Sequence, residues 1–398
     1  MADWRKELRE LAATLGSHLG LGVSALERLV DPDPYHVVGY RGYAGPGRIL
    51  VLGRVLEHEG LVTPEPGHSK FRNLLAMVKR LESDPLPFAK VRAQVAGQVV
   101  DLTADDEGFF RQWVAVGSLQ QEGWGLVQLE LLNPPDERPA RAEGPFLVPS
   151  ASASFGVISD MDDTVVQSQV TNFLRAARIV LLENARTRLP FPGVAAFYRA
   201  LQDGPSGNGR NPIFYVSSSP WNLYDVISDF LDAQGIPAGP LLLRDWDLSR
   251  SLLKNAGHKT EVITEILATY PFLPFILVGD SGQEDPEIYA ELVAAYPRRI
   301  LAVYIRNVRP HPERSDAIRK LAARVTEAGS TLVLADDSLA AARHAAVHGW
   351  IKSEALADIG EEKRADEGSG AKADAPGVET EPAPTVVVDR DIKATELE

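Results

Sequence analysis

From residue 155 onward the chain alternates between short apolar runs and helical stretches, and this alternation restricts the fold more than any other feature. Each run is nearly continuous in hydrophobic residues, which is typical of strands buried on both faces of a parallel sheet. Helical stretches between the runs are the usual connections of such strands. We therefore expect an α/β domain over residues 154–352. The predicted strands are FGVIS (155–159), PIFYVS (212–217), LLLR (241–244), PFILVG (274–279), ILAVYIR (300–306) and TLVLA (331–335).

The region before this domain has a different pattern, in which strand-like runs follow one another with few helices between them. Such a pattern predicts a small antiparallel β-sandwich, here over residues 33–135, with the helical insert FRNLLAMVKRLE. We expect a helical segment over 1–32 and a Pro-rich linker over 136–153. The predicted strands of the sandwich are RILVLGRVLE (48–57), KVRAQVAGQVVDL (90–102), GFFRQWVAV (108–116) and GWGLVQLELL (123–132).

The charge is concentrated at the end of the chain. From Asp358 onward there are twelve acidic and five basic residues, a net charge of −7, which is half of the total of −14. Because this stretch has no aromatic residue and is rich in Ala, Gly, Pro and Glu, we expect a disordered acidic tail over 353–398. The exception is TVVV (385–388), a candidate docking strand.

Composition excludes some functions. The chain has no cysteine, so it has neither a disulfide framework nor a thiolate metal site. The net charge of −14 argues against nucleic acid as a partner. The charged N-terminus lacks the apolar core of a signal peptide, which favours a cytoplasmic location.

Polar side chains follow three of the predicted parallel strands. Asp160 and Asp162 follow the first strand, Ser217 ends the second, and Asp280 ends the fourth. Lys259 begins a helix, HKTEVITEIL, that precedes the fourth strand. Ligands bind at the carboxyl ends of parallel strands, so we expect these carboxylates, the hydroxyl and the ammonium in one crevice.

These motifs resemble those of the haloacid dehalogenase (HAD) superfamily of phosphohydrolases. Asp160-Met-Asp162-Asp163-Thr164 resembles its DxDxT signature, and Ser217, Lys259 and Gly279-Asp280 with Asp285 match its other three motifs in order. The segments YVSSSPWNLY, GHKTEVI and GDSGQEDPEIY are similar to the actin-patch-protein type of phosphatidate phosphatase, a relative of the lipins. The resemblance covers about residues 155–310. It implies an α/β fold class with a HAD-like Rossmannoid parallel sheet and small insertions, after the antiparallel β-sandwich and before the disordered acidic tail.

The resemblance also implies roles in catalysis. Asp160 would be the nucleophile that attacks phosphorus and forms an aspartyl-phosphate, which divides one difficult hydrolysis into two easier steps. Asp162 would protonate the leaving oxygen and later deprotonate the attacking water. Thr164 would hold the loop by a hydrogen bond from its side chain to the backbone.

Phosphate and metal binding are implied in the same way. Ser217 and Lys259 would bind the phosphoryl oxygens, with Ser218 as second choice and Lys254 as a competitor of Lys259. Asp160, the backbone carbonyl of Asp162, and Asp280 would hold Mg²⁺, which prefers hard oxygen ligands, and Asp285 would support the site.

Each of these residues also has an ordinary structural interpretation. A D-x-D-D cluster after a strand is usually a turn or a helix cap, and Ser-Pro pairs such as Ser219-Pro220 commonly begin helices. Most helix lysines are solvated, and Asp285 before Pro286 would cap the following helix. The functional interpretation depends on the joint order and placement of the residues.

Two insertions are expected to select the substrate. The first has an apolar helical face with Arg175, Arg178, Arg186 and Arg188 beside it. This helix would be either a basic lid for an amphiphilic phosphomonoester or an ordinary helix that packs on the sheet. The second insertion, over 221–258, contains four candidate contacts to a substrate headgroup: Arg244, Trp246, Arg250 and His258.

Three functions are consistent with these features. The first is a Mg²⁺-dependent phosphatase that converts phosphatidate to diacylglycerol and contacts membranes peripherally. The second is a HAD phosphatase for a soluble phosphomonoester such as a nucleotide, a sugar phosphate or a phosphoprotein. The third is a non-enzymatic adaptor whose sandwich and tail bind proteins.

Overall fold

The computed structural model describes residues 35–57, 85–133, 139–161, 192–244, 255–308, 312–370 and 386–388. The chain divides into two compact units. The first contains 1–148 and 168–182, and the second contains 149–167 and 183–398. The helix expected within 1–32, the insert FRNLLAMVKRLE and the first insertion with its arginines lie outside the described residues.

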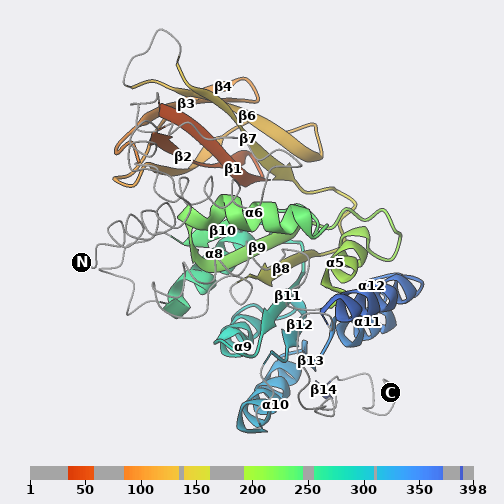
Figure 1. Ribbon diagram of the computed structural model, residues 1–398. Helices are drawn as coiled ribbons and strands as arrows, with labels where there is room; N and C mark the ends of the chain where they lie inside the picture. Colours follow the sequence, from red (N-terminus) through yellow and green to blue (C-terminus); the bar gives the residue numbers. More distant parts are fainter. Residues whose placement is uncertain are drawn as a thin grey trace, which may run out of the picture. The chain divides into compact units, whose positions relative to one another are not determined.

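The first unit is built around one seven-stranded sheet (Figure 1). Its strand order is β4-β3-β6-β7-β1-β2-β5. Neighbouring strands are antiparallel except for β1 and β7, which are parallel. The strands are β1 (Tyr35–Gly45), β2 (Arg48–Glu57), β3 (Lys90–Val95), β4 (Gln98–Thr103), β5 (Phe109–Ala115), β6 (Gly123–Leu131) and β7 (Arg141–Val148).

Local sequence explains the hairpins of this sheet. The β3–β4 turn has positive φ angles at both of its central residues, 48° at Ala96 and 76° at Gly97, as the commonest two-residue hairpin turns require. Exposed and buried residues alternate along β3, so that Val91, Ala93 and Val95 enter the core of this unit.

The strands of the expected sandwich are joined in one seven-stranded sheet, which is antiparallel except where β7 pairs with β1. One prediction for this region needs correction. The expected linker over 136–153 contains this strand β7. Its proline at 145 lowers the expectation of a strand, yet β7 pairs with β6 along its whole length and buries Phe146 in the core.

The second unit contains a seven-stranded sheet of order β10-β9-β8-β11-β12-β13-β14. All neighbouring pairs are parallel except β13 with β14, which is antiparallel. Its first six strands in chain order overlap the predicted runs. The strands are β8 (Gly156–Asp160), β9 (Ile213–Pro220), β10 (Leu241–Arg244), β11 (Phe275–Asp280), β12 (Ile300–Arg306), β13 (Thr331–Ala335) and β14 (Val386–Val388).

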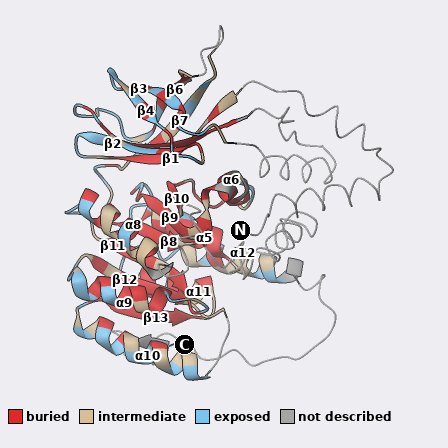
Figure 2. Cartoon of the chain, turned by 90° about the vertical axis from the view of Figure 1, so that its left-hand side faces the viewer, coloured by how far each residue is buried: buried red, intermediate tan, exposed pale blue. Residues whose placement is uncertain are grey.

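Helices surround this sheet and keep its central strands buried (Figure 2). Helices α5, α11 and α12 pack against one another, while α9 packs against both α8 and α10. No helix in the described ranges is long and apolar enough to span a bilayer. The helices are α5 (Val194–Asp203), the short 3-10 helix η2 (Trp221–Leu223), α6 (Tyr224–Ala233), α8 (Asn255–Thr269), α9 (Asp285–Ala295), α10 (Pro312–Glu327), α11 (Ser338–Val347) and α12 (Ala355–Gly370).

The expectation of disorder over 353–398 is wrong for α12. Its acidic residues cap a neighbouring helix: Glu362 Oε1 accepts a hydrogen bond from the Ala196 N–H at 2.7 Å, and Asp366 Oδ2 accepts one from the Gly193 N–H at 2.9 Å. Both N–H groups belong to the start of α5, where negative charge is favourable. Composition alone does not reveal this use of the acidic residues. The strand β14 is the candidate docking strand TVVV, paired with the edge strand β13.

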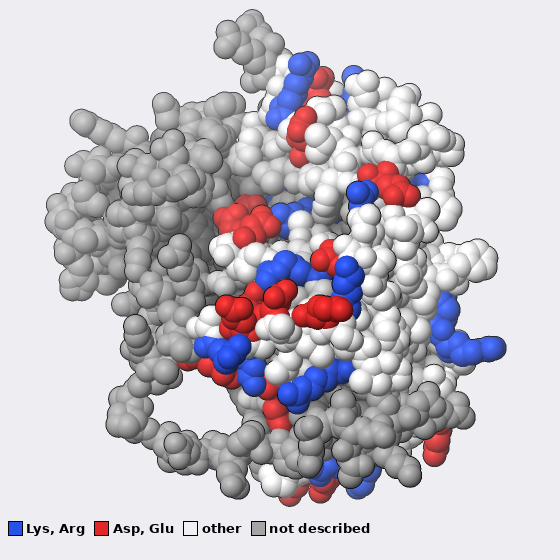
Figure 3. Space-filling view, turned by 90° about the vertical axis from the view of Figure 1, so that its right-hand side faces the viewer, with Lys and Arg blue, Asp and Glu red and all other residues white. Residues whose placement is uncertain are grey.

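Salt bridges hold α12 in place. Glu362 also pairs with Arg199 of α5, and Lys363 pairs with Asp337, the N-cap residue of α11. Figure 3, which faces the side of α5, α11 and α12, shows acidic and basic side chains next to one another. The pKa of Asp337 is lowered because the Lys363 ammonium and the N–H groups at the start of α11 together outweigh burial, which acts in the opposite direction.

Candidate active site

The centre of the site is a lysine held between two carboxylates. Lys259 Nζ lies 2.8 Å from Asp160 Oδ1 and 2.9 Å from Asp285 Oδ1. The side chains are nearly inaccessible, with exposed fractions of 4% for Lys259, 2% for Asp160 and 0% for Asp285. Asp160 is the last residue of β8, Lys259 lies on α8, and Asp285 is the first residue of α9. Residues far apart in the sequence thus form one buried ionic cluster at the carboxyl end of β8.

Asp285 also fixes the neighbouring strand end. Its Oδ2 accepts a hydrogen bond from the Asp280 N–H at 3.1 Å, so its two oxygens join Lys259 to β11. A side chain at Gly279 would place its Cβ 2.6 Å from this same oxygen, which explains why glycine precedes Asp280. The side chain of Asp285 therefore positions the cluster, and the side chain of Glu284, the N-cap residue of α9, makes no capping hydrogen bond.

The loop after β11 is held by an arginine that no sequence motif indicates. Arg314 of α10 donates from Nε to the Ser281 carbonyl at 2.9 Å, and its guanidinium also pairs with Glu287 of α9. Asp280 Oδ1 accepts a hydrogen bond from the Gly282 N–H at 2.7 Å within this loop. These contacts fix the direction of the Asp280 carboxylate.

The three carboxylates are candidates for a metal site. One ligand oxygen from each of Asp160, Asp280 and Asp285 lies within 4.8 Å of the others. Carboxylate oxygens are the ligands that Mg²⁺ prefers, and the cation usually takes only one or two of them. Because both oxygens of Asp285 already bind Lys259 and Asp280, the donor set fits a divalent cation held by Asp160 and Asp280.

The serines of the second motif lie on the next strand. In β9, Val216 is the register partner of Asp160, so Ser217 lies one residue beyond it. Ser217 is fully buried and its Oγ accepts a hydrogen bond from the Ser219 N–H at 2.9 Å, while Ser218 is half-buried. The hydroxyl of Ser217 therefore stabilises the end of β9 locally.

Most of the remaining candidates cannot be placed relative to this cluster. Asp162, Thr164, Arg175, Arg178, Trp246, Arg250 and Lys254 lie outside the described residues. Arg244 is half-buried at the end of β10, two strands from β8, and His258 is half-buried next to Lys259.

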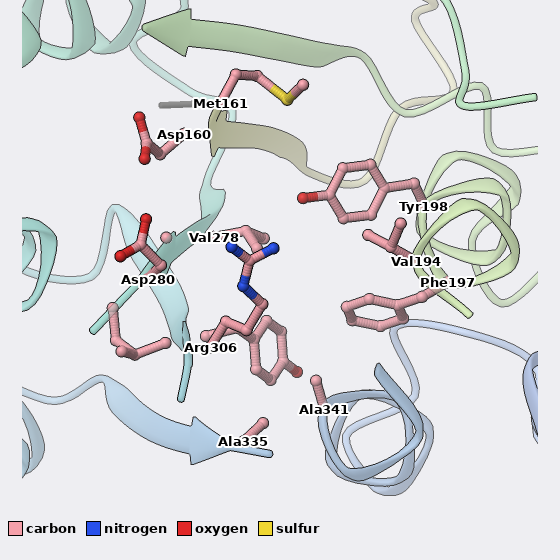
Figure 4. Close-up of a pocket in the computed structure, with 13 residues that line it drawn as sticks. Asp160, Met161, Val194, Phe197, Tyr198, Val278, Asp280, Arg306, Ala335 and Ala341 are labelled. Atoms are coloured by element: carbon pink, nitrogen blue, oxygen red, sulfur yellow. The ribbon is translucent and has the colours of Figure 1, made fainter. Parts of the chain in front are cut away.

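A pocket opens beside Asp160 and contains residues that sequence reasoning missed. Figure 4 shows the Arg306 guanidinium and the Tyr198 hydroxyl pointing into the space beside the carboxylates of Asp160 and Asp280. Arg306 ends a predicted strand, and because ligands bind at the carboxyl ends of parallel strands, its position in the sequence could have indicated a site residue. Tyr198 lies on α5 and has no such signal.

Tyr198 supports the backbone of Asp160 through a short chain of hydroxyls. Its oxygen lies 2.7 Å from Ser159 Oγ, and Ser159 Oγ donates to the Asp160 carbonyl at 3.1 Å. Burial raises the pKa of Tyr198 to about 12, so its hydroxyl stays protonated at neutral pH. With Ser159 donating to the carbonyl, Tyr198 is the donor to Ser159.

Comparison with known proteins identifies relatives of this part of the chain. Residues 155–307 match the family described as "Phosphatidate phosphatase APP1, catalytic domain". The chain is 34% identical over 155 residues to "Phosphatidate phosphatase APP1" of Saccharomyces cerevisiae. The aligned region covers 38% of this chain and 25% of that protein. It is 29% identical over 155 residues to an uncharacterized protein of Schizosaccharomyces pombe, again with 38% and 25% covered. The chain thus spans about a quarter of the length of these relatives.

The comparison with solved structures includes a carbohydrate esterase. A carbohydrate acetylesterase from Xanthomonas citri aligns with 73% of this chain and 72% of its own, with 12% identity and a TM-score of 0.23. This score is too low to indicate a shared fold.

Proposed function

We propose that residues 155–307 form the catalytic domain of a Mg²⁺-dependent phosphatase of the HAD type, and that its substrate is phosphatidate. The observation that carries the proposal is the buried Lys259 between Asp160 and Asp285, with Asp280 beside them at the carboxyl ends of parallel strands. The similarity of residues 155–307 to the catalytic domain of phosphatidate phosphatases supports the choice of reaction and substrate.

In the proposed mechanism, Asp160 is the nucleophile. One of its carboxylate oxygens forms a bond to phosphorus, the ester P–O bond breaks, and Asp162 gives its proton to the departing glycerol oxygen. In the second step Asp162 takes a proton from water, whose oxygen attacks phosphorus, and the bond to Asp160 breaks to release inorganic phosphate. Lys259 orients Asp160 in both steps and offsets its charge.

A divalent cation held by Asp160 and Asp280 would offset charge on the phosphoryl oxygens. Three carboxylates around one lysine leave the described cluster negative, which opposes the approach of an anionic substrate. A cation held there would relieve this repulsion, and Asp285 fixes the backbone of Asp280 by accepting a hydrogen bond from the Asp280 N–H.

The test is release of inorganic phosphate by the purified chain from dioctanoyl phosphatidate in mixed micelles and from p-nitrophenyl phosphate. We expect hydrolysis with Mg²⁺, none with EDTA, and none by a folded Asp160→Asn variant. Asp203→Asn is the matched control, because Asp203 is an exposed aspartate at the end of α5. Undiminished hydrolysis by Asp160→Asn would contradict the mechanism.

The two substrates separate the alternatives. Hydrolysis of the soluble ester alone would favour the second function, a phosphatase for soluble phosphomonoesters. No hydrolysis of either compound by the folded chain would favour a non-enzymatic adaptor.

A further inference from the structure

Arg306 lies beside the proposed metal ligand Asp280. It ends β12, and in the parallel pairing of β11 with β12 it is the register partner of Asp280. Adjacent strands are about 4.8 Å apart, so the two residues start from neighbouring positions at the same edge of the sheet. Both side chains line the pocket next to Asp160 (Figure 4).

The pocket combines a charged end with an apolar wall. Among the described residues that line it, Asp160, Asp280 and Arg306 are the charged ones, and Arg306 is the cation. The wall comes mainly from α5, β11 and β12, with one residue each from β13 and α11. The cavity volume is about 40 Å³, which is room for about three waters at roughly 10–15 Å³ of such volume per water. This volume has room for a small polar group.

Two cations belong to the surroundings of Asp160, one in direct contact and one in the pocket lining. Lys259 contacts it at 2.8 Å from the side of α8 and is not among the described residues that line the pocket. Lys259 already serves two carboxylates, Asp160 and Asp285. Arg306 comes from β12 and lines the pocket that Asp160 also lines.

The charge balance of the site favours a second positive side chain, in addition to Lys259, when the substrate is bound. Asp160, Asp280 and Asp285 with Lys259 carry a net charge of −2, which one divalent cation brings to zero. A phosphomonoester dianion then restores −2 in a largely buried site, where repulsion between charges is strong. A guanidinium offsets part of this charge and matches two phosphate oxygens with two parallel N–H groups.

We propose that Arg306 is a substrate-binding residue, which donates hydrogen bonds to the phosphate group of the substrate in the pocket beside Asp160 and Asp280. The inference rests on the proposed function and names a contact that its motifs do not include. The ligand it recognises is the tetrahedral phosphate dianion, so Arg306 acts on a lipid and on a soluble phosphomonoester alike.

A purely structural role for Arg306 makes a different prediction. If Arg306 only neutralised Asp280, its removal would strengthen Mg²⁺ binding and leave phosphate binding unchanged. If it binds phosphate, its removal weakens phosphate binding, whatever happens to Mg²⁺.

The experiment measures the binding of inorganic phosphate, in the presence of saturating Mg²⁺, and of Mg²⁺ alone by isothermal titration calorimetry. The full chain is compared with Arg306→Gln and Arg306→Lys. Arg343→Gln is the matched control, since Arg343 is an exposed arginine on α11. We expect the phosphate Kd to rise about 10- to 100-fold in Arg306→Gln, as for loss of hydrogen bonds to a charged group, and less in Arg306→Lys. The KM for p-nitrophenyl phosphate should rise in parallel.

Wild-type phosphate affinity in Arg306→Gln, with tighter Mg²⁺ binding, would overturn this inference and leave the proposed function intact. A wild-type chain that neither binds phosphate nor hydrolyses p-nitrophenyl phosphate would overturn both. If Arg306→Gln does not fold, Arg306→Lys decides: an unchanged phosphate Kd and KM in that variant would contradict bidentate binding by the guanidinium.

Discussion

At the residue scale, the candidate site depends on one buried lysine. Lys259 compensates Asp160 and Asp285, which are almost inaccessible to water. Removing one partner of a buried ion pair leaves an uncompensated charge, whereas an exposed pair contributes little. We therefore expect this lysine to stabilise the fold, independently of any role in a reaction.

We predict that Lys259→Met lowers the free energy of unfolding by about 3–5 kcal/mol in EDTA. Mg²⁺ should recover part of the loss, because a divalent cation offsets the same carboxylates. Denaturant unfolding with and without Mg²⁺ measures both effects. Lys320→Met, at an exposed position of α10, is the control and should unfold like wild type. A loss under 1 kcal/mol for Lys259→Met would show that the cluster is not stabilised by this lysine.

A second prediction at this scale concerns Tyr198, whose removal should affect stability and kcat but not substrate binding. Tyr198→Phe keeps the ring but removes the donor to Ser159, so we expect a loss of about 0.5–1.5 kcal/mol and a lower kcat with little change in KM. The pKa of Tyr198 is raised from 10.0 to about 12 in the folded chain. Stability from its protonated hydroxyl is thus complete below pH 10 and is lost as the pH rises toward 12.

Unfolding measured from pH 7 to pH 11 tests this sign. The difference in stability between wild type and Tyr198→Phe should be constant up to about pH 9 and shrink above pH 10. A difference that grows with alkaline pH would contradict the assignment of Tyr198 as the donor.

At the scale of elements, the decisive feature is a helix that uses acidic residues to complete another helix. Glu362 of α12 accepts a hydrogen bond from the Ala196 N–H near the start of α5 and also forms a salt bridge with Arg199. The helix α5 has no capping side chain of its own at Gly193. Since α5 also provides Tyr198 and part of the pocket wall, α12 stabilises the candidate site from a distance.

We expect Glu362→Ala to lower the free energy of unfolding by about 0.5–2 kcal/mol, the usual range for loss of a helix cap. The neighbouring Glu361→Ala is the matched control, because Glu361 is exposed. Thermal unfolding of the two variants provides the measurement. Equal melting temperatures would show that α12 lies on α5 without capping it.

At the scale of the whole molecule, the two compact units have separate cores. All described residues of the ionic cluster and of the pocket belong to the second unit. A fragment of residues 149–398 should therefore fold and keep Mg²⁺-dependent hydrolysis of p-nitrophenyl phosphate. A fragment of 149–354, which lacks α12 and β14, should have a lower melting temperature and less activity. If both fragments behave alike, the part of the chain after residue 354 contributes nothing to the second unit.

The amino-acid sequence by itself determined where most strands of the second unit lie and which polar residues follow them. Apolar runs locate β8 to β13 because burial on both faces is a local, readable pattern, and the positions of Asp160, Ser217 and Asp280 at the ends of those runs mark them as site candidates. The order of motifs along the chain indicates Lys259 and Asp285.

Only the tertiary structure decided which of these residues touch. That Asp285 binds both Lys259 and the Asp280 N–H, that Arg306 stands beside Asp280, and that an acidic segment forms α12 were not readable from the chain. Ion pairs and helix caps join residues up to 173 positions apart, as between Asp366 and Gly193. No local pattern of hydrophobicity records such a pairing, because its free energy arises only when two distant backbones have already been packed together.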